Sequence, residues 1–265
     1  PSVDFKAHVN GGHLGSAVLG EGDINFSYMN RALSIRKFYI PIGDGVLAAQ
    51  GQMTTDGALN IQAAAKDMDV SWVPQALGKK NISIGGKLTA AVNLSGTRAN
   101  PVADVSVGVD HPRYGDITFD SFSLLANASN NVVTLQNALL QRGTYRASMK
   151  GTMPGNLFTG NTEDKAVPMD LDINLDQADM NMLALFFKPI TSASGPIQGH
   201  VKVAGSYDDP LLLGGISVKD GALTLTTLNE PVSPITLGVT FSGKTASLDG
   251  SAAFGGGSLT TKGNI

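Results

Sequence analysis

The sequence predicts an all-β fold: an elongated, unclosed sheet that curls into a trough, built from stacked repeats with a few short helices. Glycine makes up 32 of the 265 residues, against a usual share of about 7%, whereas charged residues make up only 15%. Apolar and polar residues alternate over many stretches, as in β-strands with one buried face. A helical period is readable at only two places.

Two stretches of the chain, 86–101 and 195–210, repeat one another. Both read Gly, nine residues, Gly, four residues, Pro, and the alternation of Leu88–Leu94 is in phase with that of Ile197–Val203. A period of two that is kept in phase predicts a strand with one apolar and one polar face. The Gly-x4-Pro element predicts a turn, with a new strand that begins at the proline.

The repeats also end alike, in the segments 45–51, 143–151 and 255–263. We therefore expect the end of a preceding β repeat over 1–66, a β repeat over 67–175 and a second over 176–265. The chain reads as a fragment of a longer protein.

The two helical patterns lie at the start of the last two repeats, in 67–77 and 176–190. Asp69 and Asp179 are expected N-caps. We expect Trp72 and Phe186–Phe187 to pack these helices onto the sheet; the alternative is that they plug or gate the trough. One helical face carries Met180, Leu183, Ala184 and Phe187.

One face of the predicted sheet is apolar along the chain and needs a cover. The pattern gives about twenty strands of mostly five to seven residues, hence a sheet of ~90–100 Å by ~20 Å. Two short helices are too small to cover it. A second sheet or a bound acyl chain remain as alternatives. The candidate groove residues are Ile24, Phe26, Leu88, Val92, Leu94, Val105, Val107, Val109, Tyr145, Met149, Ile197, Val201, Val203, Leu223, Leu225, Leu237, Val239 and Phe241.

The stretch GVTFSGKT, 238–245, matches the nucleotide-binding P-loop pattern G-x-x-x-x-G-K-[ST]. A P-loop needs a helix directly after it, but residues 246–265 alternate and contain three consecutive glycines. We therefore expect a β-hairpin that places Lys244 in its turn, and no nucleotide.

Composition and spacing argue against several other classes. A net charge of −3 provides no basic field for nucleic acid, and no cysteine is present for thiolate chemistry or disulfides. No stretch of eighteen apolar residues and no signal peptide is readable. No catalytic motif appears, so we expect a protein that is not an enzyme and has no cofactor.

Three polar groups could suggest metal or acid–base chemistry, and each has a simpler interpretation. His8 and His13 are expected to be solvated loop residues. Asp208 and Asp209 offer too few oxygens for Ca²⁺ and are expected in a turn. The polar face of a strand is expected to carry Asp172, Asn174 and Asp176.

The stretch SGPIQGHVKVAGSYDDPLLLGGISVKDGALTL, 194–225, resembles the repeated unit of the TamB and AsmA-like proteins of diderm bacteria. That unit reads G-x-[IV]-x-G-x-[VL]-x-[VL]-x-G-[ST]-x4-P, followed by a G-x-I-x-[VL]-x-[DN]-G turn. The first copy departs from it, because Ala90 stands where the second copy has Gly199 and 102–115 lacks the Asp-Gly turn. The resemblance extends over essentially the whole chain.

This resemblance implies a periplasmic β-trough that is anchored in the inner membrane by an N-terminal helix and reaches the outer membrane. It implies phospholipid transport between the membranes, and outer-membrane protein assembly with a barrel partner of the TamA or BamA type. The alternative from a different class is a structural β-rod, such as an adhesin spacer, that holds no lipid.

Overall fold

The computed structural model describes residues 2–76, 78, 83–155, 168–183, 187 and 189–265. In these residues eighteen strands belong to one unclosed antiparallel sheet. The helical segments described are a four-residue α-helix and a three-residue 3-10 helix. The prediction of an all-β fold on an unclosed sheet is confirmed. Within the described residues, no helix is long and apolar enough to cross a membrane.

The chain divides into two compact units, Pro1–Gln136 (unit 1) and Asn137–Ile265 (unit 2). The boundary falls inside strand β10, Val132–Arg142. These units are defined by compactness rather than by sequence repetition, so the repeat boundaries expected from the sequence stay predictions.

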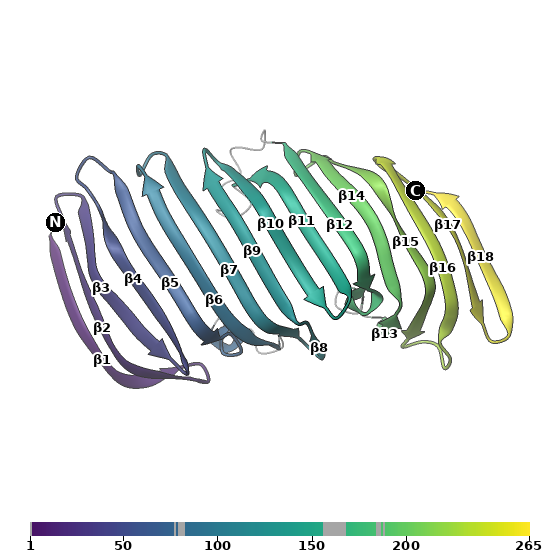
Figure 1. Ribbon diagram of the computed structural model, residues 1–265, viewed down its shortest axis with the longest axis horizontal. Helices are drawn as coiled ribbons and strands as arrows, with labels where there is room; N and C mark the ends of the chain where they lie inside the picture. Colours follow the sequence, from purple (N-terminus) through teal and green to yellow (C-terminus); the bar gives the residue numbers. More distant parts are fainter. Residues whose placement is uncertain (1, 77, 79–82, 156–167, 184–186, 188) are drawn as a thin grey trace. The chain divides into compact units, whose positions relative to one another are not determined.

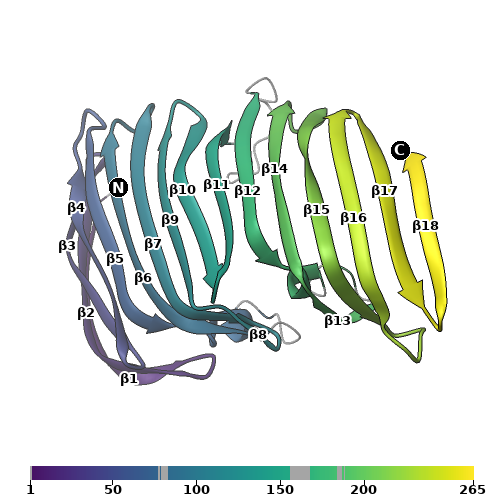
Figure 2. The ribbon, with the colours of Figure 1, turned by 45° about the vertical axis from the view of Figure 1, so that its right-hand side comes forward.

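Unit 1 is an antiparallel meander in which each strand from β1 to β6 pairs with the next (Figure 1). Strand β7 pairs with both the two-residue β8 and the longer β9. The strands lie side by side and curve along their length (Figure 2). The elements of unit 1 before β10 are β1 Val3–Leu14, β2 Ala17–Met29, β3 Ala32–Ile42, β4 Gly45–Met53, β5 Leu59–Asp69, α1 Val73–Ala76, β6 Ile84–Gly96, β7 Pro101–Tyr114, β8 Ile117–Thr118 and β9 Ser121–Ser129.

Unit 2 has the same meander, and the short β13 pairs with the far end of β15. Both Gly-x4-Pro elements are turns as predicted, because β6 ends at Gly96 before β7 begins at Pro101, and β14 ends at Gly205 before β15 begins at Pro210. The elements of unit 2 after β10 are β11 Tyr145–Pro154, β12 Met169–Asp179, η1 Met180–Met182, β13 Ile190–Ser194, β14 Pro196–Gly205, β15 Pro210–Leu225, β16 Val232–Gly243, β17 Thr245–Phe254 and β18 Gly257–Asn264.

The strands are longer than the predicted five to seven residues; β7 has 14 and β15 has 16. Bulges explain the difference. In β5, β12 and β15 the register shifts at a residue with a left-handed backbone: Asp67, Gln177 and Asp220. A bulge moves the alternation by one residue without ending the strand, so a sequence pattern of period two stops there although the strand continues.

The helices lie where the sequence predicts helical segments, but they are shorter. The predicted helical segments begin with residues that belong to β5 and β12. Asp69 is not the N-cap of α1, because its Oδ1 accepts a hydrogen bond from Ser71 N at 2.7 Å and closes a turn that precedes the helix. The side chain of Asp179, and residues Ala184 and Phe186, lie outside the described part.

Candidate apolar groove

The strand register of unit 1 gathers the apolar residues on one face. Directly opposed residues in an antiparallel pair point to the same side of the sheet, so a row can be followed from strand to strand. One row crosses seven strands through Ile24, Phe38, Ala49, Ala63, Val92, Val105 and Ala126. Neighbouring rows hold the remaining unit 1 candidates, Phe26, Leu88, Leu94, Val107 and Val109.

This apolar face is open. The eight candidate side chains in unit 1 are half-buried, and no second sheet is present in the described residues of the unit. A groove of about 430 Å³ is hollowed in the face between β2 and β5, with Ile24, Phe26, Ile35 and Leu47 in its lining. At the β1 side, the rings of Phe5 and Phe26 stack with their centroids 5.1 Å apart.

One end of the unit 1 face is closed by its own side chains. Ile42, Ala65 and Met68 form a buried cluster there, and Trp72 packs against it from the turn that leads into α1. The prediction that Trp72 packs a short helix onto the sheet is confirmed. Its indole Nε1 is buried and has no hydrogen-bond partner among the described residues.

Unit 2 repeats the arrangement. A row of opposed residues on its apolar face runs through Met149, Ile173, Val201, Gly214, Phe241 and Ala246. Adjacent positions on this face hold Ile197, Val203, Leu237 and Val239, and Tyr145 lies two residues before Ala147 on β11. Leu223 and Leu225 lie beyond the bulge of β15, opposite β13, at the end of the face rather than in its middle.

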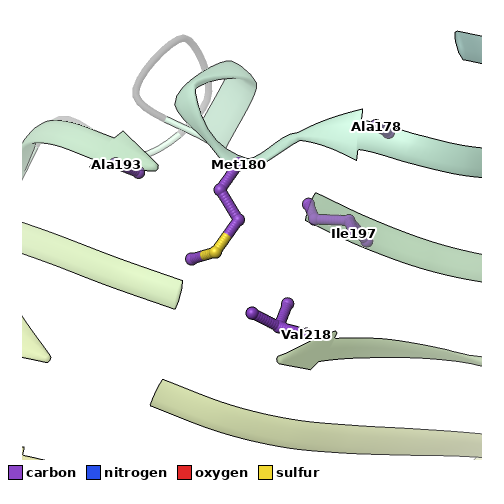
Figure 3. Packing of buried hydrophobic residues seen from close by; sticks show 5 residues of the cluster. All are labelled: Ala178, Met180, Ala193, Ile197 and Val218. Atoms are coloured by element: carbon purple, nitrogen blue, oxygen red, sulfur yellow. The ribbon is translucent and has the colours of Figure 1, made fainter. Parts of the chain in front are cut away.

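The closed end in unit 2 is built around Met180. Its side chain extends from the helical turn into a buried cluster with Ala178, Ala193, Ile197 and Val218 (Figure 3). A Cβ on Gly221 would lie 2.7 Å from Met180 Sδ, so the glycine leaves room for the thioether. The expectation that Phe187 packs onto the sheet is wrong, because 56% of this residue is exposed to solvent.

The opposite face of unit 1 is polar. On β1–β3, Asp23 accepts hydrogen bonds from Lys37 Nζ at 2.5 Å and pairs with His8 Nδ1 at 2.9 Å. The Lys37 bond, and then the His8 bond, hold the pKa of Asp23 below its ordinary value. All three side chains are well exposed, so solvent screens these pairs and they contribute little to stability. Their position shows that this face of the sheet is in contact with water.

The polar face of unit 2 carries the acidic residues of β12 as predicted. Asp172 Oδ1 pairs with His200 Nε2 at 3.0 Å, and Asp170 Oδ1 pairs with Lys202 Nζ at 2.8 Å. The hydrogen bond from Lys202 to Asp170 raises the pKa of the lysine. Asp170 and Asp172 thus serve cross-strand pairing with β14.

The P-loop sequence forms a hairpin, as predicted. Ser242 lies opposite Thr245 across the β16–β17 turn, and Gly243 has a φ of 74°, a conformation that two-residue hairpin loops favour. Lys244 Nζ lies 2.6 Å from Asp209 Oδ1 in the neighbouring turn. Asp208 and Asp209 lie in this turn between β14 and β15, as expected.

His8 and His13 belong to strand β1 and not to a loop, because β1 continues through Gly11 and Gly12. Among the described residues no group of three or more His, Asp or Glu side chains could hold a metal ion.

Sequence reasoning missed the groove residues of β3 and β4, such as Leu33, Ile35 and Leu47. The register shift between Ile35 and Phe38 breaks the alternation of this stretch. The sequence still shows one alternating run on each side of the shift. The two runs can be assigned to the same face of the sheet only when the position of the bulge is known.

No protein-family model, curated protein or solved structure matches the chain.

Proposed function

We propose that the apolar face shields the acyl chains of lipids from water. The observation that carries the proposal is the row of opposed apolar residues that crosses each unit on one open face. An acyl chain is a suitable cover, since burial of each CH₂ gains ~0.8 kcal/mol, and a chain of about fifteen carbons gains on the order of 10 kcal/mol.

The biological setting in the proposal comes from the resemblance of 194–225 to the TamB and AsmA-like repeats. On that basis the chain is part of a periplasmic protein, anchored in the inner membrane, that carries phospholipid between the inner and outer membranes. The same likeness supports an outer-membrane barrel of the TamA or BamA type as its partner, with a role in outer-membrane protein assembly.

Photo-crosslinking tests the lipid part of the proposal. A diazirine amino acid is placed at Val92 or Val201 on the apolar face, and at the neighbouring Asn93 or Lys202 on the polar face. The chain is then exposed to light with phospholipid vesicles, and lipid attachment is measured by mass spectrometry. We expect lipid adducts from Val92 and Val201 at several times the yield from Asn93 and Lys202.

Equal yields from the two faces would overturn the proposal. The chain would then be better described as a structural β-rod or adhesin-like spacer, whose half-buried apolar face contributes to folding alone. Native mass spectrometry of the purified chain gives an independent reading, since a lipid-shielding groove should retain phospholipid and a rod should not.

A further inference from the structure

The two ends of the unit 1 strands differ in chemistry. The buried cluster of Ile42, Ala65 and Met68, with Trp72 packed against it, closes one end of the apolar face. The other end carries the turns β2–β3, β4–β5 and β6–β7, at the top of unit 1 in Figure 1. A cavity of about 480 Å³ lies among these turns, and its lining includes Arg31, Met53, Asp56, Thr97 and Arg98. We call it the basic cavity.

Two arginines bring positive charge to the basic cavity from separate turns. Arg31 is held at the tip of the β2–β3 turn by a left-handed backbone with a φ of 67°. Arg98 is positioned by its own backbone, whose N–H donates to Gly57 O at 2.8 Å. In the described part of the chain neither guanidinium makes a hydrogen bond or ion pair, in contrast to Arg36, which lies 3.5 Å from Asp4.

One carboxylate shares the basic cavity. Asp56 Oδ1 accepts a hydrogen bond from the Thr54 hydroxyl, and backbone N–H groups of its own turn bond to it as well. The Thr54 bond, and then the backbone bonds, hold the pKa of Asp56 below its ordinary value. Two arginines and one aspartate leave a single positive charge, which one phosphodiester neutralises. Arginine is also the side chain best shaped to bind phosphate oxygens in pairs.

The basic cavity adjoins the apolar groove. Leu33 lines the groove, Met53 lines the basic cavity, and the two residues are directly opposed across β3 and β4. From Met53 to Gly45, β4 spans nine residues, about 26 Å at ~3.3 Å per residue. An acyl chain that fills half of a ~30 Å hydrocarbon core is ~15 Å long, so it fits between the basic cavity and the closed end.

We propose that Arg31 and Arg98 bind the phosphodiester of a glycerophospholipid whose acyl chains lie along the unit 1 apolar face. This inference rests on the proposed function and adds to it a headgroup site and an orientation of the bound lipid. The phosphate lies at the turns, and the ends of the acyl chains point towards Trp72.

Unit 2 offers an internal comparison. At the repeat offset, Tyr207 stands where unit 1 has Arg98, and Lys244 in the adjacent turn is tied to Asp209 at 2.6 Å. The corresponding turns of unit 2 therefore present no pair of free cations in their described residues. Lys244 is a matched control, since it is an exposed cation in a turn at the end of an apolar face.

The test compares three probes, each below its aggregation concentration: dihexanoyl-phosphatidylglycerol, dihexanoylglycerol, which has the same chains and no phosphate, and glycerol 3-phosphate. Binding constants are measured by calorimetry for the unchanged chain, for Arg31→Gln/Arg98→Gln and for Lys244→Gln, with circular dichroism as the folding control. We expect phosphatidylglycerol to bind at least ten times more tightly than dihexanoylglycerol. The double variant should lose about tenfold or more of this preference, since a hydrogen bond to a charged group is worth ~1.5–3 kcal/mol.

The outcomes separate the two proposals. Equal binding of the two lipids overturns the headgroup site and leaves the groove intact, whereas no binding of either lipid overturns both. Binding of glycerol 3-phosphate as tight as that of phosphatidylglycerol would assign the arginines to a free phosphate ester instead. A folded double variant that binds dihexanoylglycerol normally and has lost only the phosphate preference supports the inference. An equal loss in Lys244→Gln counts against it.

Discussion

Gly151 occupies a strand position that no other residue fits. Its φ is 128°, and a Cβ at this position would lie 1.9 Å from Asp170 O in the neighbouring strand. Gly51, at the end of the matching segment 45–51, has a φ of 135° and a Cβ position 2.2 Å from Asn60 O. These glycines let neighbouring strands approach closely while the repeat motif continues.

We expect Gly151→Ala to lower the free energy of unfolding by about 2 kcal/mol or more, because the methyl group must displace backbone atoms and the backbone must adopt a left-handed conformation. Urea denaturation followed by circular dichroism measures the change. Gly263→Ala is the control: it ends the matching segment 255–263, and no heavy atom lies within 4 Å of its Cβ position. We expect its effect to stay within ~0.5 kcal/mol; equal effects would contradict this account of Gly151.

At the same scale, alternation in the sequence was enough to place Val92 and Val201 on the apolar face, since the period of a strand is a local property. The bulges at Asp67 and Gln177 were not predictable, because a left-handed residue other than glycine leaves no clear mark in composition. The arginines of the basic cavity were also missed. Arg31 and Arg98 are 67 positions apart (31 to 98), and only the strand pairing brings their turns together.

Among the elements, the short helical segments stabilise the fold at one end of each apolar face. Met180, in η1, is 2% exposed among Ala178, Ile197 and Val218. We expect Met180→Ala to lower the free energy of unfolding by about 2–5 kcal/mol, since it leaves a cavity in a buried cluster. Met29→Ala is the control at 56% exposure, and a change within ~0.5 kcal/mol is expected. Similar losses for both methionines would show that η1 does not anchor the unit.

The β16–β17 hairpin carries a second prediction at this scale. Lys244 is fixed in a turn and paired with Asp209, and the strand β17 follows it where a P-loop would place a helix. Without a helix N-terminus there is no ring of N–H groups around a phosphate. We expect no heat of binding when ATP and Mg²⁺ are titrated into the chain by calorimetry. A micromolar site that Lys244→Ala abolishes would contradict the hairpin interpretation.

For the molecule as a whole, the separation of the two faces is the property on which the proposed function depends. Val201→Asp places a carboxylate between Ile173 and Gly214 on the unit 2 apolar face. Its desolvation beside an acyl chain costs more than ~1.4 kcal/mol, so we expect at least tenfold weaker binding of a fluorescent phospholipid. Ser217→Asp is the control, because Ser217 lies on the polar face opposite Gln198 and Gly238. Unchanged binding by a folded Val201→Asp chain would argue that lipid does not use this face.

The fold class was predictable at this scale because glycine content and alternation act over the whole chain. The sequence could not predict what covers the apolar face, since a second sheet and a bound ligand require the same alternation of apolar and polar residues in the strands. The strand pairing excludes a second sheet within the described residues, because all the described strands belong to one sheet.

The meander has a consequence for how the chain folds. Nearly every strand pairs with its neighbour in the sequence, so most native contacts close short loops and the contact order is low for a β protein. Loop closure of this kind has a small entropic penalty, and it favours rapid folding. A nascent chain can therefore add one strand after another to the growing edge as it emerges, and each new strand finds its template already in place.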